Sequence, residues 1–153
     1  MQQTFDWLGE EAKMNAIATE RTIIYSQTVK QCSPVFATLK SMLGDRKYFI
    51  LEIPHSCSPS ANKKAVLESF RQTDGKIKIL VATITFGLGV DCKGVHRTIH
   101  FGSSKNIEYF IQESDRAGRD GLQSFSYVLY HGLLLTRVEK DINNFVKPVQ
   151  ENC

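Results

Sequence analysis

Short apolar runs rich in β-branched and aromatic residues recur along the chain and predict β-strands. Several runs are apolar through their centre, which is typical of strands that helices cover on both faces. The predicted strands are RTIIYS (21–26), KYFILEI (47–53), KIKILVAT (76–83), VHRTIHF (95–101) and SFSYVLY (124–130).

Apolar residues between these runs recur at steps of three and four, which predicts amphipathic helices. The clearest example spans residues 29–43 and is followed by Gly44, a typical C-cap residue. Ser33 and Pro34 interrupt this pattern and could restart the helix, so we expect an irregular first turn there. Capping residues that predict further helix starts are Ser58, Asn106 and Thr136.

The order of these elements, a leading helix followed by alternating strands and helices, predicts an α/β fold. We expect one open, mostly parallel sheet of about five or six strands with helices on both faces. Residues 1–20 are expected to form the leading helix and an interdomain linker, residues 21–147 the α/β domain and residues 148–153 a tail. Ligands of such sheets gather at the carboxyl ends of the strands, so we expect the motifs described next to lie there.

Composition and charge narrow the function only slightly. The 153 residues can bury a core as one domain, and a formal charge of +3 favours nucleic acid only mildly. The cysteines lack C-x-x-C spacing and the histidines complete no zinc pattern, so we expect free thiols, a reducing compartment and no metal site. No apolar run approaches the roughly 20 residues that span a bilayer, and we expect no membrane contact. The N-terminal segment lacks the order of a signal peptide, which favours an intracellular, soluble protein.

The segment VATITFGLGVD (81–91) follows the third predicted strand and turns on Gly87 and Gly89. A dinucleotide fingerprint would need a third glycine, where this chain has Cys92, and an acidic residue about 20 positions later. Such a site is disfavoured, and a plain glycine turn stays open as an alternative. The sequence also holds neither a G-x-x-x-x-G-K-[ST] phosphate loop nor a D-E-x-H or D-E-x-D segment for magnesium. We therefore do not expect this chain to bind and activate a nucleoside triphosphate unaided.

The segment QESDRAGRDG (112–121) carries Arg116 and Arg119 in a glycine-containing turn. The planar guanidinium group has a permanent charge and a fork of donors that fits phosphate oxygens. An isolated arginine pair is also common on protein surfaces as part of an ion pair, so the pair needs support from the rest of the chain.

That support comes from a resemblance. VATITFGLGVD, VHRTIHFG and YFIQESDRAGRDG closely resemble motifs V and VI of RecQ-like helicases of superfamily 2. RTIIYSQT resembles motif IV, and the His55–Ser56 step resembles motif IVa. The resemblance covers residues 5–147 and concerns the second RecA-like domain only. It implies half of an ATP-dependent 3′-to-5′ DNA helicase, with single-stranded or duplex DNA as a partner and residence in the nucleus.

On the nucleotide side, the resemblance implies that a first RecA-like domain, in cis or in trans, binds most of the ATP and Mg²⁺. Arg116 and Arg119 would then be arginine fingers, and Gln112 would position an arginine or sense the nucleotide. Gly89 and Asp91 would lie near the nucleotide or at the domain interface, and a capped turn remains the alternative for both. Glu113 is expected to orient motif VI by pairing internally. Asp115 departs from the family, which usually has glycine there, and its charge could pair with Arg116 or repel a triphosphate.

On the nucleic-acid side, the residues implied to touch the backbone follow predicted strands. They are Thr83, Thr85, His55, Ser56, Gln27 and Thr28. Hydroxyl and amide groups bind phosphates without reading bases. A surface loop remains the alternative for His55 and Ser56, and a helix cap remains the alternative for Thr28.

Two functional hypotheses therefore remain. The chain is either half of a helicase, inactive alone because it lacks a phosphate loop, or a non-catalytic nucleic-acid-binding or interaction module that keeps the fold as a scaffold.

Overall fold

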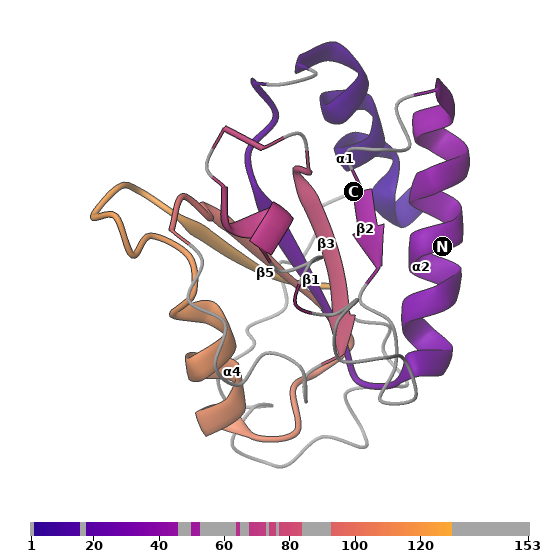
Figure 1. Ribbon diagram of the computed structural model, residues 1–153. Coiled ribbons are helices and arrows are strands. Elements are labelled where there is room, and N and C mark those ends of the chain that lie inside the picture. The colour runs from indigo at the N-terminus through magenta and orange to yellow at the C-terminus, as the bar shows by residue number, and fades with distance from the viewer. Residues whose placement is uncertain are drawn as a thin grey trace, which may run out of the picture.

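A parallel five-stranded sheet organises the protein, and the computed structural model confirms the predicted α/β architecture (Figure 1). The structure describes residues 2–15, 18–45, 50–52, 64, 68–72, 74–75, 77–83 and 93–129. The strands lie in the order β2-β3-β1-β4-β5, and every neighbouring pair is parallel. Their bounds are β1 Thr22–Ser26, β2 Ile50–Glu52, β3 Ile79–Thr83, β4 Arg97–Phe101 and β5 Phe125–Leu129.

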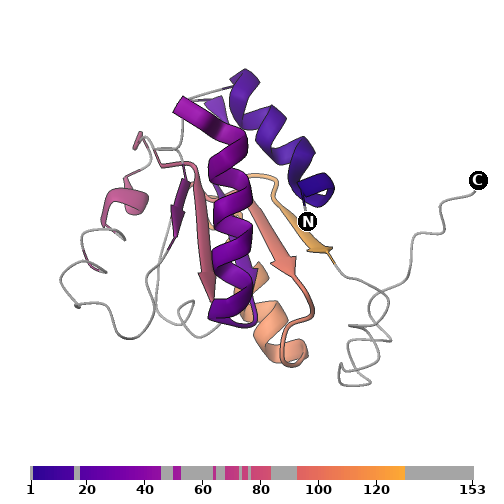
Figure 2. The same cartoon turned by 90° about the vertical axis from the view of Figure 1, so that its right-hand side faces the viewer.

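Helices cover both faces of the sheet. Figure 2 shows α2 (Val29–Leu43) lying across one face with α1 (Gln2–Asn15) beside it, while α4 (Ile107–Ser114) lies on the other face. None of the helices in the described ranges combines the length and apolar character that crossing a lipid bilayer needs.

The helix starts can be compared with their predictions. Asn106 caps α4 as predicted, because its side-chain oxygen accepts the Tyr109 N–H at 3.0 Å. The irregular first turn expected in α2 is wrong, since the helix runs unbroken across Pro34 from its N-cap residue Thr28. Pro34 is exposed, so the carbonyl that loses its helical partner can be hydrated by solvent. The predicted starts at Ser58 and Thr136 lie outside the described residues.

The leading helix α1 belongs to the packed core. Phe5, Leu8 and Ala12 are completely buried and pack with Ile24 of β1 and Ile99 of β4. Because α1 shares this apolar core, burial of its inner face stabilises the domain. The division of residues 1–20 from the rest as a helix and linker stays a prediction.

An ion-pair cluster fastens α1 to the sheet as well. Arg97 of β4 donates to both carboxylate oxygens of Glu11, at 2.9 and 3.2 Å, and to Glu20 at 2.6 Å. Its guanidinium also lies over the Trp7 ring, 5.2 Å from the centroid. The buried charge of Arg97 is therefore compensated, as buried charges must be.

Candidate functional site

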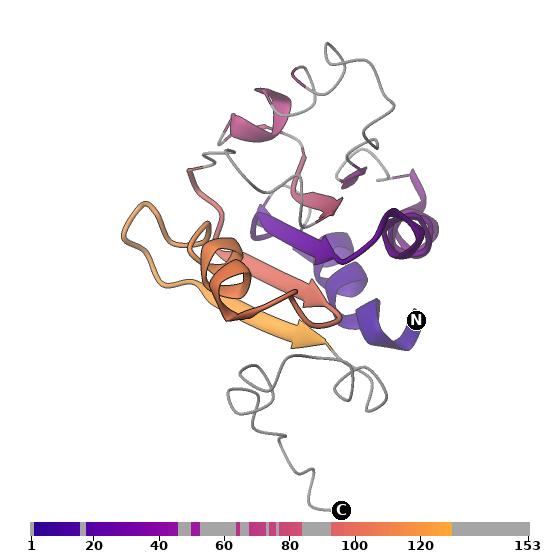
Figure 3. The same ribbon diagram turned by 90° about the horizontal axis from the view of Figure 1, so that it is seen from below.

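Residues 115–121, here called the arginine turn, lie at the amino ends of the strands. The Gly118 N–H donates to the carbonyl of Val95 at 2.8 Å, just before β4 begins. In Figure 3 the segment between α4 and β5 lies at the ends of β4 and β5 that are away from their arrowheads. The expectation that this motif lies at the carboxyl ends is therefore wrong. Helix α4 starts at that edge but runs back across the sheet, and so carries the arginines to the amino edge.

Two further contacts fix the arginine turn in place. His96 Nε2 lies 2.7 Å from Asp120 Oδ2, and Asp120 Oδ1 accepts the Leu122 N–H at 3.1 Å. The hydrogen bond with His96 is the main cause that lowers the pKa of Asp120. Gly118 has a φ of +76°, and a Cβ there would lie 2.6 Å from the Ser124 hydroxyl oxygen, so only glycine fits.

The two arginines differ in exposure. Arg116 is only 7% exposed, whereas the Arg119 side chain is 37% exposed. Arg119 Nε donates to the backbone oxygen of Asp115 at 3.0 Å, and its Nη2 lies 3.4 Å from Asp115 Oδ2. Asp115 has φ −65° and ψ −3°, a right-handed conformation open to any residue, so its effect on the turn comes from its charge.

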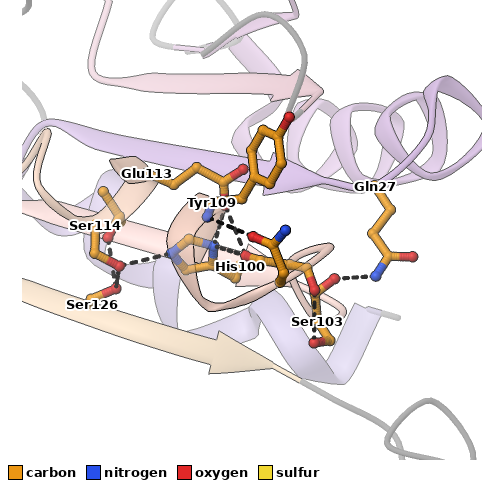
Figure 4. Close-up of polar contacts among 10 residues, drawn as sticks. Gln27, His100, Ser103, Tyr109, Glu113, Ser114 and Ser126 are labelled. Atoms are coloured by element: carbon orange, nitrogen blue, oxygen red, sulfur yellow. Dashed lines mark hydrogen bonds and ion pairs between the residues drawn. The ribbon is translucent and has the colours of Figure 1, made fainter. Parts of the chain in front are cut away.

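Glu113 of α4 pairs inside the protein, as expected. Its Oε2 lies 3.0 Å from His100 Nδ1 and accepts the Ser104 hydroxyl at 2.8 Å (Figure 4). Sequence reasoning missed His100 and Ser104. The available signal was a histidine inside a predicted strand, between Ile99 and Phe101, where burial demands a polar partner.

The candidate nucleic-acid residues in the described ranges gather at the opposite, carboxyl edge. Gln27 directly follows β1, and its side-chain amide donates to the Ser103 carbonyl beyond β4. The Gln31 side-chain oxygen accepts the N–H groups of Gln27 at 3.1 Å and Thr28 at 3.3 Å. Thr83 ends β3 in register with Ser26 and is partly exposed. Gln27, Thr28 and Thr83 therefore share one edge.

The remaining candidates differ in what the structure says of them. Gln112 is exposed on α4. Thr85, Gly89, Asp91, His55 and Ser56 lie outside the described residues. Among the residues that are described, no group of three or more histidine, cysteine, aspartate or glutamate side chains could hold a metal ion.

Comparison with known protein families identifies the family of this chain. The model of the helicase conserved C-terminal domain matches residues 4–121. The chain belongs to this helicase family. Several RecQ-family helicases match this helicase C-terminal domain at 29–43% identity. These matches agree with the resemblance of the sequence motifs to RecQ-like helicases.

Two relatives illustrate the range of the family. A candidate ATP-dependent RNA helicase of Acanthamoeba polyphaga mimivirus is 36% identical over 118 residues, which are 77% of this chain and 20% of that protein. The Mus musculus bifunctional 3′-5′ exonuclease/ATP-dependent helicase WRN is 36% identical over 110 residues, which are 71% of this chain and 7% of that protein. The chain therefore spans at most a fifth of either relative.

A solved structure supports the fold of this helicase C-terminal domain. Domain 2 of the DEAD-box helicase Mss116p, solved bound to an RNA duplex, superposes with a TM-score of 0.70 at 22% identity. The match covers 83% of this chain and 48% of that one. At this identity the likeness shows the RecA-like fold alone. The ligands of this chain have to be inferred from its own residues.

Proposed function

We propose that this chain is the second RecA-like half of an ATP-dependent 3′-to-5′ DNA helicase of the RecQ type. The observation that carries the proposal is the arginine turn, which Gly118 and Asp120 fix to the start of β4 while the Arg119 side chain stays 37% exposed. A guanidinium held in this way can meet an anion that a first RecA-like domain grips. Because the chain has no phosphate loop, we expect it neither to hydrolyse ATP nor to unwind DNA alone.

On the nucleotide side, Arg119 acts as the arginine finger on an ATP whose Mg²⁺ the first domain holds. Such a finger is worth about 10³–10⁵ in rate because it stabilises charge on the transferred phosphoryl group. The Asp115 carboxylate opposes this role, since it contacts Arg119 and has the same sign of charge as a triphosphate. The Arg119–Asp115 contact therefore opens when ATP binds. Arg116 is buried and has to turn outward to take part. Further neighbours of the nucleotide are Gln112, Gly89 and Asp91.

On the nucleic-acid side, the carboxyl edge binds the backbone of single-stranded DNA. Gln27, Thr28 and Thr83 share this edge, and their hydroxyl and amide groups suit phosphate oxygens. Thr85, His55 and Ser56 are proposed to extend the same surface. Relatives named as DNA helicases support DNA as the strand. The nucleus is proposed as the compartment from the RecQ-like resemblance of the motifs.

The test is reconstitution of ATPase activity. The chain is mixed with a separately purified first RecA-like domain of a RecQ-type helicase, single-stranded DNA, ATP and Mg²⁺. Neither part alone should turn over ATP, the mixture should, and Arg119→Ala should abolish the gain. Arg71→Ala is the matched control, since Arg71 is also an exposed arginine in a local ion pair, with Glu68 at 3.4 Å. No gain on mixing would contradict the helicase function.

One observation favours a second candidate, a non-catalytic nucleic-acid-binding module. Asp115, which stands where RecQ-type helicases usually have glycine, contacts the arginine that should face the triphosphate. If the mixture has no ATPase activity but the chain still binds single-stranded DNA, the module becomes the better description.

A further inference from the structure

A buried histidine connects the arginine turn to the sheet. His100 of β4 is 1% exposed, and its ring lies between those of Tyr25 and Phe110, with centroids 5.4 and 4.7 Å away. Its Nδ1 lies 3.0 Å from Glu113 Oε2, and its Nε2 lies 3.3 Å from the Ser114 hydroxyl (Figure 4). Both ring nitrogens therefore contact the end of α4, directly before the arginine turn.

The hydroxyl groups around this histidine form one continuous chain of hydrogen bonds. Thr98 donates to Ser126 at 2.9 Å, and the hydroxyls of Ser126 and Ser114 lie 2.8 Å apart. If His100 carries its proton on Nδ1, Ser126 donates to Ser114, Ser114 donates to Nε2, and Nδ1 donates to Glu113. Each of these hydroxyl protons then has an acceptor, and the Glu113 carboxylate receives the last bond. Strands β4 and β5 are thereby joined to α4 by oriented polar contacts.

The order Ser114, His100, Glu113 also has the contacts of a hydrolytic triad, but the surroundings do not support that chemistry. A triad needs free backbone amides to bind the oxyanion. The amides of Asp115, Arg116 and Ala117 donate to carbonyls of the preceding helical turn instead. Because the amides that follow Ser114 are engaged, the histidine is better suited to holding α4 than to activating the serine.

The hydrogen bonds around His100 also extend towards the carboxyl edge of the sheet. Ser104 lies 3.2 Å from His100 Nδ1 and donates to Glu113. The backbone carbonyl of the preceding residue, Ser103, accepts a hydrogen bond from the side-chain amide of Gln27, which directly follows β1. A continuous set of contacts therefore runs from the proposed nucleic-acid surface to the end of α4.

We propose that His100 and Glu113 are a positioning pair, which fixes the arginine turn relative to the sheet and links it to Gln27 at the carboxyl edge. The inference rests on the proposed function for its role in ATP turnover, but the positioning itself is a property of the free chain. Neither residue touches ATP in this proposal. They act by holding the backbone that carries Arg119.

The first test uses the full chain without any ligand. His100→Phe keeps a ring between Tyr25 and Phe110 but removes both nitrogens, and adding Glu113→Gln avoids leaving a buried charge unpaired. In the double variant, hydrogen exchange at the Ala117 and Gly118 amides should be at least about tenfold faster, while exchange in β1 and β3 stays unchanged. Ile99→Val, on the opposite face of β4, is the control for general loosening of the core. Unchanged exchange in the arginine turn of a folded double variant would overturn the proposal.

The second test uses the reconstituted ATPase. In the double variant, kcat should fall at least about tenfold while KM for ATP changes less than about threefold, because the finger acts mainly in the transition state. Stimulation by single-stranded DNA should fall as well. A double variant with wild-type kcat and DNA stimulation would refute the link to turnover. If the wild-type mixture itself is inactive, the proposed function fails, and hydrogen exchange alone still decides whether the pair positions the turn.

Discussion

Arg119 folds back onto Asp115, four residues earlier, and holds it through both a backbone and a side-chain contact. The Nε–O distance is 3.0 Å and the Nη2–Oδ2 distance is 3.4 Å. The Asp115 side chain is 75% exposed, so this contact lies in high-dielectric surroundings and can open readily. Within the proposed helicase, Asp115 is therefore a local competitor for the arginine finger.

Replacing Asp115 by glycine should strengthen the action of Arg119. An exposed ion pair is worth about 0.2–1 kcal/mol, so its loss should raise kcat/KM for ATP in the reconstituted ATPase by about 1.4- to fivefold. Asp115→Asn should behave in the same way, whereas Asp115→Glu, which keeps the charge, should not. Equal kcat/KM values for all of these variants would show that the Asp115 charge does not compete with ATP for Arg119.

Charge removal at the two ends of α2 should have different effects on nucleic-acid binding. Lys30 lies exposed in the first turn, beside Thr28 at the carboxyl edge, and Lys40 lies exposed in the last turn. If single-stranded DNA follows the carboxyl edge, Lys30→Ala should weaken binding and reduce the slope of log K against log salt by about 0.7. Lys40→Ala removes the same charge and should leave the slope unchanged. Fluorescence anisotropy of a labelled oligonucleotide measures both, and equal effects would argue against binding at that edge.

The fold could be predicted from the sequence because the central strands β1, β3 and β4 are buried on both faces. The predicted strands 76–83 and 95–101 contain β3 and β4 within a few residues. Asn106 was found because a cap must satisfy free amides at a helix start, and that requirement is local. The course of α2 at Pro34 was not predictable in this way, since packing of the whole helix on the sheet outweighs the loss of one hydrogen bond.

The candidate site was predicted less completely. The resemblance to RecQ-like helicases proposed Arg119 and Gln27 as candidates, but not that they lie at opposite edges of the sheet. That separation depends on α4 reversing the chain direction, a geometric consequence of joining parallel strands through a helix. The contacts of His100 with Glu113 and Ser104 depend on which side chains meet across the fold. Sequence distance alone does not reveal them.

The tie between His96 and Asp120 should weaken in acid. The pKa of Asp120 is lowered from its ordinary value of 3.8, chiefly by the hydrogen bond with His96. A carboxyl group with a lowered pKa stabilises the folded state above its unfolded pKa, and this contribution is lost as pH falls through the folded value. Asp120→Asn should therefore be less stable than the wild type in urea unfolding at about pH 6, with the difference shrinking below about pH 4. A difference that stays constant across this range would contradict the assignment.

Lys78 should destabilise the protein at neutral pH. It is 5% exposed and lies beside Arg21, and burial, followed by the positive charge of Arg21, lowers its pKa. Lys78→Met keeps the length of the side chain without its charge and should raise the free energy of unfolding by about 0.5–2 kcal/mol at about pH 7. Between the folded and unfolded pKa values of Lys78, the unfolded chain binds more protons than the folded one, so the wild type gains stability as pH rises. The stability advantage of Lys78→Met should therefore shrink towards about pH 10. Lys40→Met, at an exposed position, should change stability by less than about 0.5 kcal/mol. Urea unfolding at both pH values measures these effects, and a Lys78→Met variant no more stable than the wild type would show that the lysine is adequately compensated.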